Sequence, residues 1–121
     1  MPTVDLRALA EESFCYLTTT GRVTGRAHEI EIWFSLVPET QNLYMLSGGG
    51  DRSDWVKNLR RDPEVTVRIA GEQLSGRARE ARDAEEDELA RRLLVEKYES
   101  SPGGLANWRR NALPVAVDLS E

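Results

Sequence analysis

The hydrophobic positions of this chain recur mainly with a period of two, which indicates β-strands. The segment 28–34 shows the pattern most clearly, because an apolar face alternates with a face that carries two glutamates and Trp33; the apolar face consists of His28, Ile30, Ile32 and Phe34. Runs rich in β-branched, aromatic or alternating apolar residues predict further strands over 14–20, 42–47, 64–70, 73–81 and 113–119.

Two helices are expected in the first half of the chain. A short one, capped by Thr3, is predicted to end near Ser13. A second follows the glycine run 48–50, with Asp51 or Ser53 as its cap, and Pro63 prevents its continuation. Its core-facing side chains are predicted to be Trp55, Val56 and Leu59.

The second half contains a longer helix, from Asp83 to about Tyr98. Asp83 and Glu86 have capping-box spacing, and the acidic run 85–88 suits the amino end of a helix exposed to solvent. The predicted apolar stripe is Leu89, Leu93 and Leu94. A helical turn is expected over 105–111.

The order of these elements defines the fold class. Strands outnumber helices and neighbouring strands are joined by short turns, which favours an α+β fold with a mainly antiparallel barrel of about six strands and packed helices. A length of 121 residues suits one domain, spanning 1–121, because two domains would each lack a core.

Composition excludes several classes of function. A formal charge of -5 and a pI near 5.0 disfavour nucleic acid as a partner. The amino terminus is acidic where a signal peptide is apolar, and no run approaches the roughly 18 apolar residues of a membrane span, so a soluble, cytoplasmic protein is expected. One cysteine and one histidine allow neither a cysteine-based zinc site nor a multi-histidine site, and no metal is expected.

Two segments carry candidate chemistry. Ser47 and the glycine run stand between a strand and a helix, where free N–H groups favour an anion. The turn 18–26 brings threonine hydroxyls together with Arg22 and Arg26, which are groups that hold phosphate or carboxylate oxygens. Taken alone, a segment of either kind is more often a flexible or solvated turn.

Together, TTTGRVTGRAHEI and LSGGGDRSDWVKNLRRDPEVTVRI resemble the deazaflavin-dependent nitroreductase family over the span Phe14 to Ala81. The resemblance implies a split β-barrel like that of the flavin-binding pyridoxamine-phosphate oxidases. It also implies that coenzyme F420 binds in a groove, and that its reduced form passes hydride to a small electrophilic acceptor such as a quinone, a nitro compound or an activated alkene.

The resemblance assigns roles by position. Arg22 and Arg26 would face the phosphate or the acidic tail of F420, and Asn58 would orient the loop. Ser47 and Tyr98 would act on the acceptor, as hydrogen-bond or proton donors, beside Trp108 in the substrate pocket. The full predicted cofactor set is Thr19, Thr20, Gly21, Arg22, Arg26, Ser47, Gly48, Gly49, Gly50 and Asn58.

The chain also departs from the family pattern. Val23 stands where a lysine is common, and His28 and Glu31 stand where arginine and proline are frequent. One phosphate contact is therefore missing, and two alternatives stay open: an FMN-dependent oxidoreductase on the same barrel, or a non-catalytic flavin carrier or interaction domain. The expected partners are a small electron acceptor and a second copy in a homodimer.

Three residues carry interpretations of their own. His28 is expected to be a structural or surface residue. Cys15 is expected to be a buried small hydrophobe without a reactive thiolate. Trp33 lies on the glutamate face, so it is either part of a dimer surface, a ligand platform, or a core residue buried by closure of the barrel.

Overall fold

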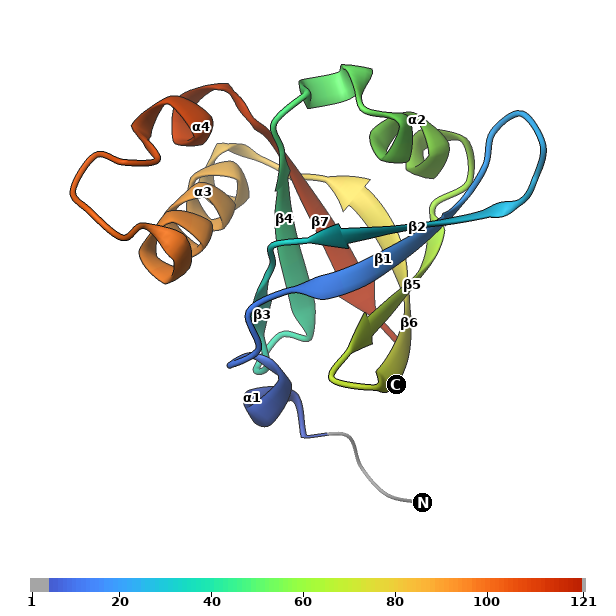
Figure 1. The fold of residues 1–121 in the computed structure, drawn as a ribbon, viewed down its shortest axis with the longest axis horizontal. Helices are drawn as coiled ribbons and strands as arrows, with labels where there is room; N and C mark the ends of the chain where they lie inside the picture. Colours follow the sequence, from blue (N-terminus) through green and yellow to red (C-terminus); the bar gives the residue numbers. More distant parts are fainter. Residues whose placement is uncertain (1–4, 121) are drawn as a thin grey trace.

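The structure, a computed structural model, describes residues 5–120, and its centre is one antiparallel sheet with the strand order β2-β1-β5-β6-β7-β4-β3 (Figure 1). Every neighbouring pair is antiparallel, as predicted. The seven strands are β1 (Cys15–Thr20), β2 (Ala27–Ile32), β3 (Ser35–Val37), β4 (Asn42–Ser47), β5 (Glu64–Ile69), β6 (Glu72–Glu80) and β7 (Leu113–Leu119).

The two edge strands, β2 and β3, are consecutive in the chain, so the sheet curls into a half-barrel whose edges meet at Trp33 and Phe34. The strand expected over 28–34 ends at Ile32, and Ser35–Val37 form a separate strand, so the sheet has seven strands where about six were expected. The N–H of Phe34 donates to the Tyr98 hydroxyl (3.1 Å), and its carbonyl accepts from Lys97 Nζ (2.9 Å). Because helix side chains satisfy these backbone groups, the strand breaks here and the chain turns the corner of the barrel.

The core fills the inside of the half-barrel, and the alternation of the strands decides which residues enter it. Along β4, Leu43 and Met45 belong to this inner cluster. Tyr44 and Leu46 belong to a second cluster on the outer face, beneath helix α3. Both faces of β4 are therefore buried, which explains why NLYMLS is almost continuously apolar.

Four α-helices and a 3-10 turn surround the sheet; they are α1 (Leu6–Leu9), η1 (Gly50–Arg52), α2 (Asp54–Arg61), α3 (Ala84–Tyr98) and α4 (Ala106–Asn111). In Figure 1, α2 lies over the upper end of the barrel, α1 lies at the lower end, and α3 and α4 lie together on the left. Val56 and Leu59 of α2 enter the core as predicted. No helix within residues 5–120 is both long and apolar enough to cross a membrane.

The predicted helix ends are partly corrected by the structure. The expected cap Thr3 lies outside the described residues, and α1 stops at Leu9 rather than near Ser13. Asp5 caps it, because its Oδ1 accepts from the N–H groups of Arg7 (3.1 Å) and Ala8 (3.3 Å). At α3 the prediction is confirmed: Asp83 accepts from the N–H of Glu86, and the helix ends at Tyr98.

A partly buried ion network fixes the start of α3 to the sheet. Arg79 of β6 contacts Glu86 with both terminal nitrogens (2.6 and 3.0 Å) and reaches Asp118 of β7 with Nε (2.8 Å). These hydrogen bonds hold the pKa of Glu86 well below its usual range, at about 2. Tyr44 also donates to Glu86 (3.1 Å), and burial together with this bond raises the pKa of Tyr44 to about 12.

Candidate functional site

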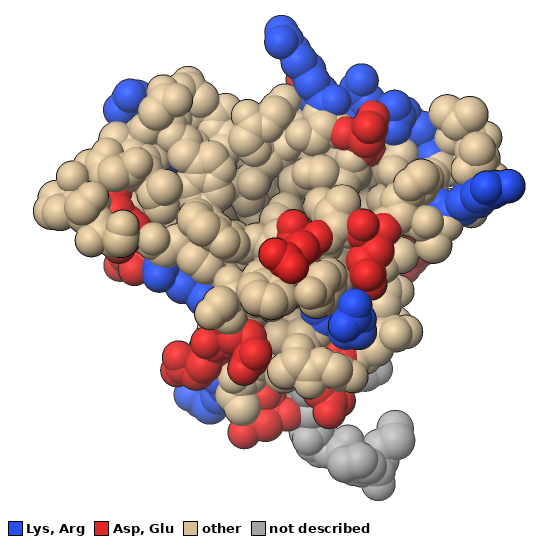
Figure 2. Space-filling view, viewed as in Figure 1, with Lys and Arg blue, Asp and Glu red and all other residues tan. Residues whose placement is uncertain are grey.

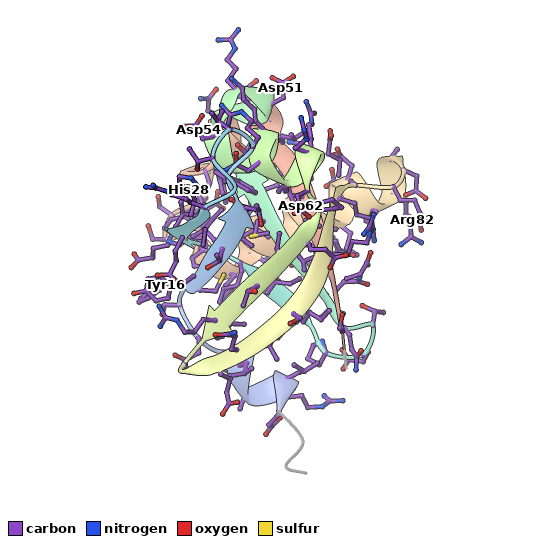
Figure 3. The ribbon with its side chains drawn as sticks, turned by 90° about the vertical axis from the view of Figure 1, so that its right-hand side faces the viewer. Tyr16, His28, Asp51, Asp54, Asp62 and Arg82 are labelled. Atoms are coloured by element: carbon purple, nitrogen blue, oxygen red, sulfur yellow. The ribbon has the colours of Figure 1, made fainter. Side chains whose placement is uncertain are left out.

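The predicted turn between β1 and β2 lies beside α2, and the two elements enclose a cavity of about 420 Å³, the hairpin cavity. Residues of the turn and of β2 line one side of it, and residues of α2 line the other; those used below are Arg22, His28, Asp54, Trp55 and Asn58. Figure 3 shows Asp54 beside the hairpin loop and His28 directed outward from β2. Of the two roles expected for His28, structural or surface, the structure supports the second, because His28 is exposed.

Asn58 joins the hairpin to α2 from a buried position, with 4% of its surface exposed. Its Oδ1 accepts from the backbone N–H of Arg22 (3.1 Å) and from Arg22 Nη1 (2.9 Å). Its Nδ2 donates to Oγ1 of Thr19 (3.2 Å), which is also buried. Three of the predicted cofactor residues thus form one network, in which Asn58 sets the direction of the Arg22 side chain.

The guanidinium of Arg22 extends from this network to the surface of α2. Nη2 lies 3.1 Å from Oδ1 of Asp54, and Nη1 donates to the Asp54 carbonyl (3.4 Å). Arg26 has a different place: its carbonyl accepts from the N–H of Gly21 (2.7 Å), which closes the turn. A Cβ at Gly21 would lie 2.7 Å from Nε2 of His28 and 3.1 Å from the carbonyl of Arg26, so a side chain here would displace the His28 imidazole and crowd the turn.

The glycine loop is held together by Ser47, which is 1% exposed at the end of β4. Its hydroxyl donates to the carbonyl of Gly50 (2.9 Å) and lies 2.8 Å from the hydroxyl of Ser53. Ser53 occupies the N-cap position of α2 without making a side-chain cap bond, so its hydroxyl serves the loop instead. Since the Ser47 hydroxyl has one proton and donates it to the Gly50 carbonyl, this serine stabilises the conformation of the loop.

Beyond the glycine loop lies a second cavity of about 490 Å³, the aromatic cavity, lined by Glu31, Ile32, Trp33, Leu46, Leu105 and Trp108. The indoles of Trp33 and Trp108 are perpendicular, with centroids 5.7 Å apart. A Cβ built on Gly48 would lie 3.8 Å from Trp108, so the loop borders this indole. Trp33 remains 43% exposed, which rules out core burial and leaves the surface or platform interpretation.

Tyr98 packs against Trp33, one of the residues that line the aromatic cavity. Its ring stacks on Trp33 with centroids 4.3 Å apart and planes within 2°. The hydroxyl lies within hydrogen-bond distance of the carbonyls of Ser13 (2.8 Å) and Phe34 (3.0 Å), and burial raises its pKa. Tyr98 therefore holds Trp33 in place, whereas the predicted donation to an acceptor remains a prediction.

The two cavities are neighbours along β2, because Glu29 and Ile30 line the first and Glu31 and Ile32 line the second. Figure 2 shows Lys and Arg gathered at the upper right, over α2 and the hairpin, and few charges at the upper left, over α4. A guanidinium at one end and two indoles at the other fit an elongated ligand with an anionic group and a flat ring system.

Sequence reasoning missed three parts of this site. Trp55 was assigned to the core, yet it also lines the hairpin cavity. Asp54 received no role from the sequence, although it meets Arg22 across 32 residues of chain. The stacking of Trp33 on Tyr98 was not foreseen, and its one signal was a large aromatic residue on the glutamate face of a strand.

Solved structures with the same fold support the predicted split barrel. An F420-H2 dependent reductase, FDR-A, is 26% identical over 87% of this chain and 93% of that chain, with a TM-score of 0.67. A structure described as a domain-swapped dimer is also 26% identical, over 87% and 79%, with a TM-score of 0.68. A putative 5-nitroimidazole antibiotic resistance protein from Bacteroides thetaiotaomicron is 15% identical over 96% and 78%, with a TM-score of 0.73.

The family model for F420H(2)-dependent quinone reductase matches residues 6–120, nearly the whole chain. This match confirms the resemblance inferred from the hairpin and glycine-loop motifs. It also confirms the expected enzyme class, an oxidoreductase, and F420 rather than FMN as the cofactor. The chain belongs to the F420H(2)-dependent quinone reductase family.

Proposed function

We propose that this protein binds F420H2 in the groove formed by the hairpin and aromatic cavities, and reduces a small planar electrophile such as a quinone, a nitro compound or an activated alkene. The observation that carries the proposal is the pairing, along one strand, of a cationic end at Arg22 with an aromatic end at Trp33 and Trp108. A flat acceptor suits the second end, because offset or edge-to-face aromatic contacts favour planar rings.

The residues of the cationic end act by binding and positioning. Arg22 receives the phosphate or the acidic tail of the cofactor, and its side chain is directed there by Asn58 and Thr19. Thr20 and Gly21 close β1 and the turn, and the backbone carbonyl of Arg26 completes that turn. A side chain at residue 21 would clash with the imidazole of His28.

The residues of the aromatic end hold the reacting partners and exclude water. The hydrogen bond from Ser47 to Gly50 holds the glycine loop, residues 48–50, in a fixed conformation. Because this loop has no side chains, a flat ring can approach its backbone closely beside Trp108. The bound cofactor supplies two electrons and a proton as hydride, and the acceptor takes its second proton from solvent. Neither the Ser47 nor the Tyr98 hydroxyl has a free proton aimed into the cavity, so we propose positioning roles for both.

We also propose that residues 1–121 act as one cofactor-binding domain, in the cytoplasm, and that two copies pair. Large apolar side chains remain exposed at Phe14 before β1 (42%), Val23 in the turn between β1 and β2 (87%) and Trp33 after β2 (43%). A neighbour described as a domain-swapped dimer supports pairing. Light scattering is expected to give the mass of a dimer, and a monomer mass would reject this part of the proposal.

The first test is calorimetric titration of the protein with F420, FMN, FAD and haem. F420 is expected to bind preferentially, and Arg22→Ala is expected to weaken its binding about tenfold or more. Arg92→Ala is a matched control, because Arg92 is an exposed arginine of α3, away from both cavities. Equal F420 affinity of the wild type and Arg22→Ala would contradict the proposed binding of F420 in the hairpin cavity.

Reduction of acceptors then tests the aromatic end. Trp108→Ala is expected to raise KM for a quinone and for a nitroaromatic compound while leaving F420 affinity within about threefold of wild type. Reduction of no acceptor by a protein that binds F420 would favour the carrier interpretation.

A further inference from the structure

The Arg22 side chain has two partners of very different character. Asn58 is buried and belongs to the folded frame of the hairpin. Asp54 is at the surface: its side chain is 85% exposed, whereas that of Arg22 is 33% exposed. The contact with Asn58 is therefore shielded from solvent on the Asn58 side, whereas the contact with Asp54 is open to exchange with an anionic group from solution.

The carboxylate of Asp54 pairs with the terminal nitrogen of Arg22 that Asn58 does not bind. Its Oδ1 lies 3.1 Å from Nη2 of Arg22, while Nη1 is directed to Asn58 (2.9 Å). A phosphate or carboxylate group that bound Arg22 without breaking its bond to Asn58 would take the same Nη2. A carboxylate and a phosphate cannot both occupy that position, because their like charges repel at contact distance.

The remaining charges around the cavity do not compensate for Asp54. Of the described residues that line it, only Arg22 is a lysine or arginine. Glu29 adds a second carboxylate, which pairs with Arg68 (3.3 Å) on the sheet, and His28 is the remaining titratable group. Asp54 therefore neutralises the single fixed positive charge that the hairpin cavity offers to an anion.

We propose that Asp54 is an internal competitor at the anion-binding end of the groove: its carboxylate occupies Arg22 until an anionic group of the cofactor displaces it. This inference rests on the proposed binding of F420 in the hairpin cavity. The competition makes the groove selective, since small free anions gain too little to displace Asp54. A ligand that also places a flat ring in the aromatic cavity gains the additional contacts needed to displace it.

The test compares Asp54→Asn with Asp51→Asn by calorimetry at low and high salt. Asp51 is a matched control, because it is an exposed aspartate on η1 whose ion-pair partner is Arg60 (3.8 Å), and Figure 3 shows both aspartates at the same end of α2. The probes are inorganic pyrophosphate, F420, and the deazaflavin ribityl core that lacks phosphate and tail. Thermal unfolding verifies that each variant is folded.

Asp54→Asn is expected to bind pyrophosphate and F420 roughly three- to tenfold more tightly than wild type at low salt, with a smaller gain at high salt. The phosphate-free core is expected to bind both proteins equally. Asp51→Asn is expected to change every affinity less than twofold, because it alters net charge without touching Arg22.

Other results overturn the inference in separable ways. Weaker F420 binding by Asp54→Asn would mean that Asp54 orients Arg22 for the ligand. An equal gain in affinity for pyrophosphate and F420 in Asp51→Asn would mean that the change in net charge alone explains the effect. Unchanged affinity in Asp54→Asn, with weakened binding in Arg22→Ala, would reject competition and leave the proposed function intact. Unchanged affinity in Arg22→Ala would reject the proposed groove itself.

Discussion

Asn58 is the residue through which folding and the candidate site are most closely connected. Asn58→Ala removes both hydrogen bonds accepted by Oδ1 and the one donated by Nδ2. The guanidinium of Arg22 can be hydrated at the surface, but its backbone N–H and the buried Thr19 hydroxyl lose their partner. One partly buried and one buried group, each left unsatisfied at about 1 to 2 kcal/mol, predict a loss of roughly 2 to 4 kcal/mol in the free energy of unfolding.

Urea denaturation followed by circular dichroism measures this loss directly, and the melting temperature is expected to fall by roughly 10 °C. The matched control is Asn111→Ala, because Asn111 also uses its Nδ2 in a side-chain bond, to Asn107 (2.7 Å), but lies exposed on α4. Its loss is expected to stay below about 0.5 kcal/mol. F420 binding is expected to weaken in Asn58→Ala, since Arg22 loses its direction.

A double-mutant cycle with Thr19→Val separates the network from simple loss of packing. The two residues share one hydrogen bond, so their coupling energy is expected to be about 1 kcal/mol. The reasoning is refuted if Asn58→Ala unfolds at the same urea concentration as wild type, or if Asn111→Ala costs as much.

Three further predictions concern the rest of the molecule. The pKa of Glu86 in the folded protein, about 2, lies below its value in the unfolded chain, so ionised Glu86 stabilises the folded state above about pH 4.5 and this contribution is lost as pH falls towards 2. The free energy of unfolding is therefore expected to depend less steeply on pH between 4.5 and 2 in Glu86→Gln than in wild type. The exposed control Glu96→Gln is expected to keep the wild-type pH dependence. Gly76→Ala is expected to cost roughly 2 kcal/mol or more in urea, since its Cβ would lie 2.5 Å from a side chain of β7, whereas Gly48→Ala has 3.8 Å of room and should unfold like wild type. Burial raises the pKa of the Cys15 thiol to about 12, so a thiol reagent at pH 8 is expected to label it only after unfolding, and rapid labelling of the folded protein would contradict this.

Local sequence determined most of the secondary structure of this protein. The hairpin of β5 and β6 was predicted from two alternating runs around Ala70 and Gly71, and both residues have the positive φ that such a tight turn needs (51° and 83°). Asp83 and the acidic run after it were sufficient to place the start of α3. The hairpin motif, the glycine loop and their separation were sufficient to indicate the family.

Tertiary structure alone decided how these elements meet. The corner at Trp33 and Phe34 exists because Lys97 and Tyr98, more than 60 residues away, satisfy its backbone groups. The orientation of Arg22 likewise depends on atoms of α2, and the proton of Ser47 is directed to the loop. Periodicity records which face of a segment is buried, because burial acts on each residue locally. It carries no record of which distant donor and acceptor will meet, because that depends on the path of the whole chain.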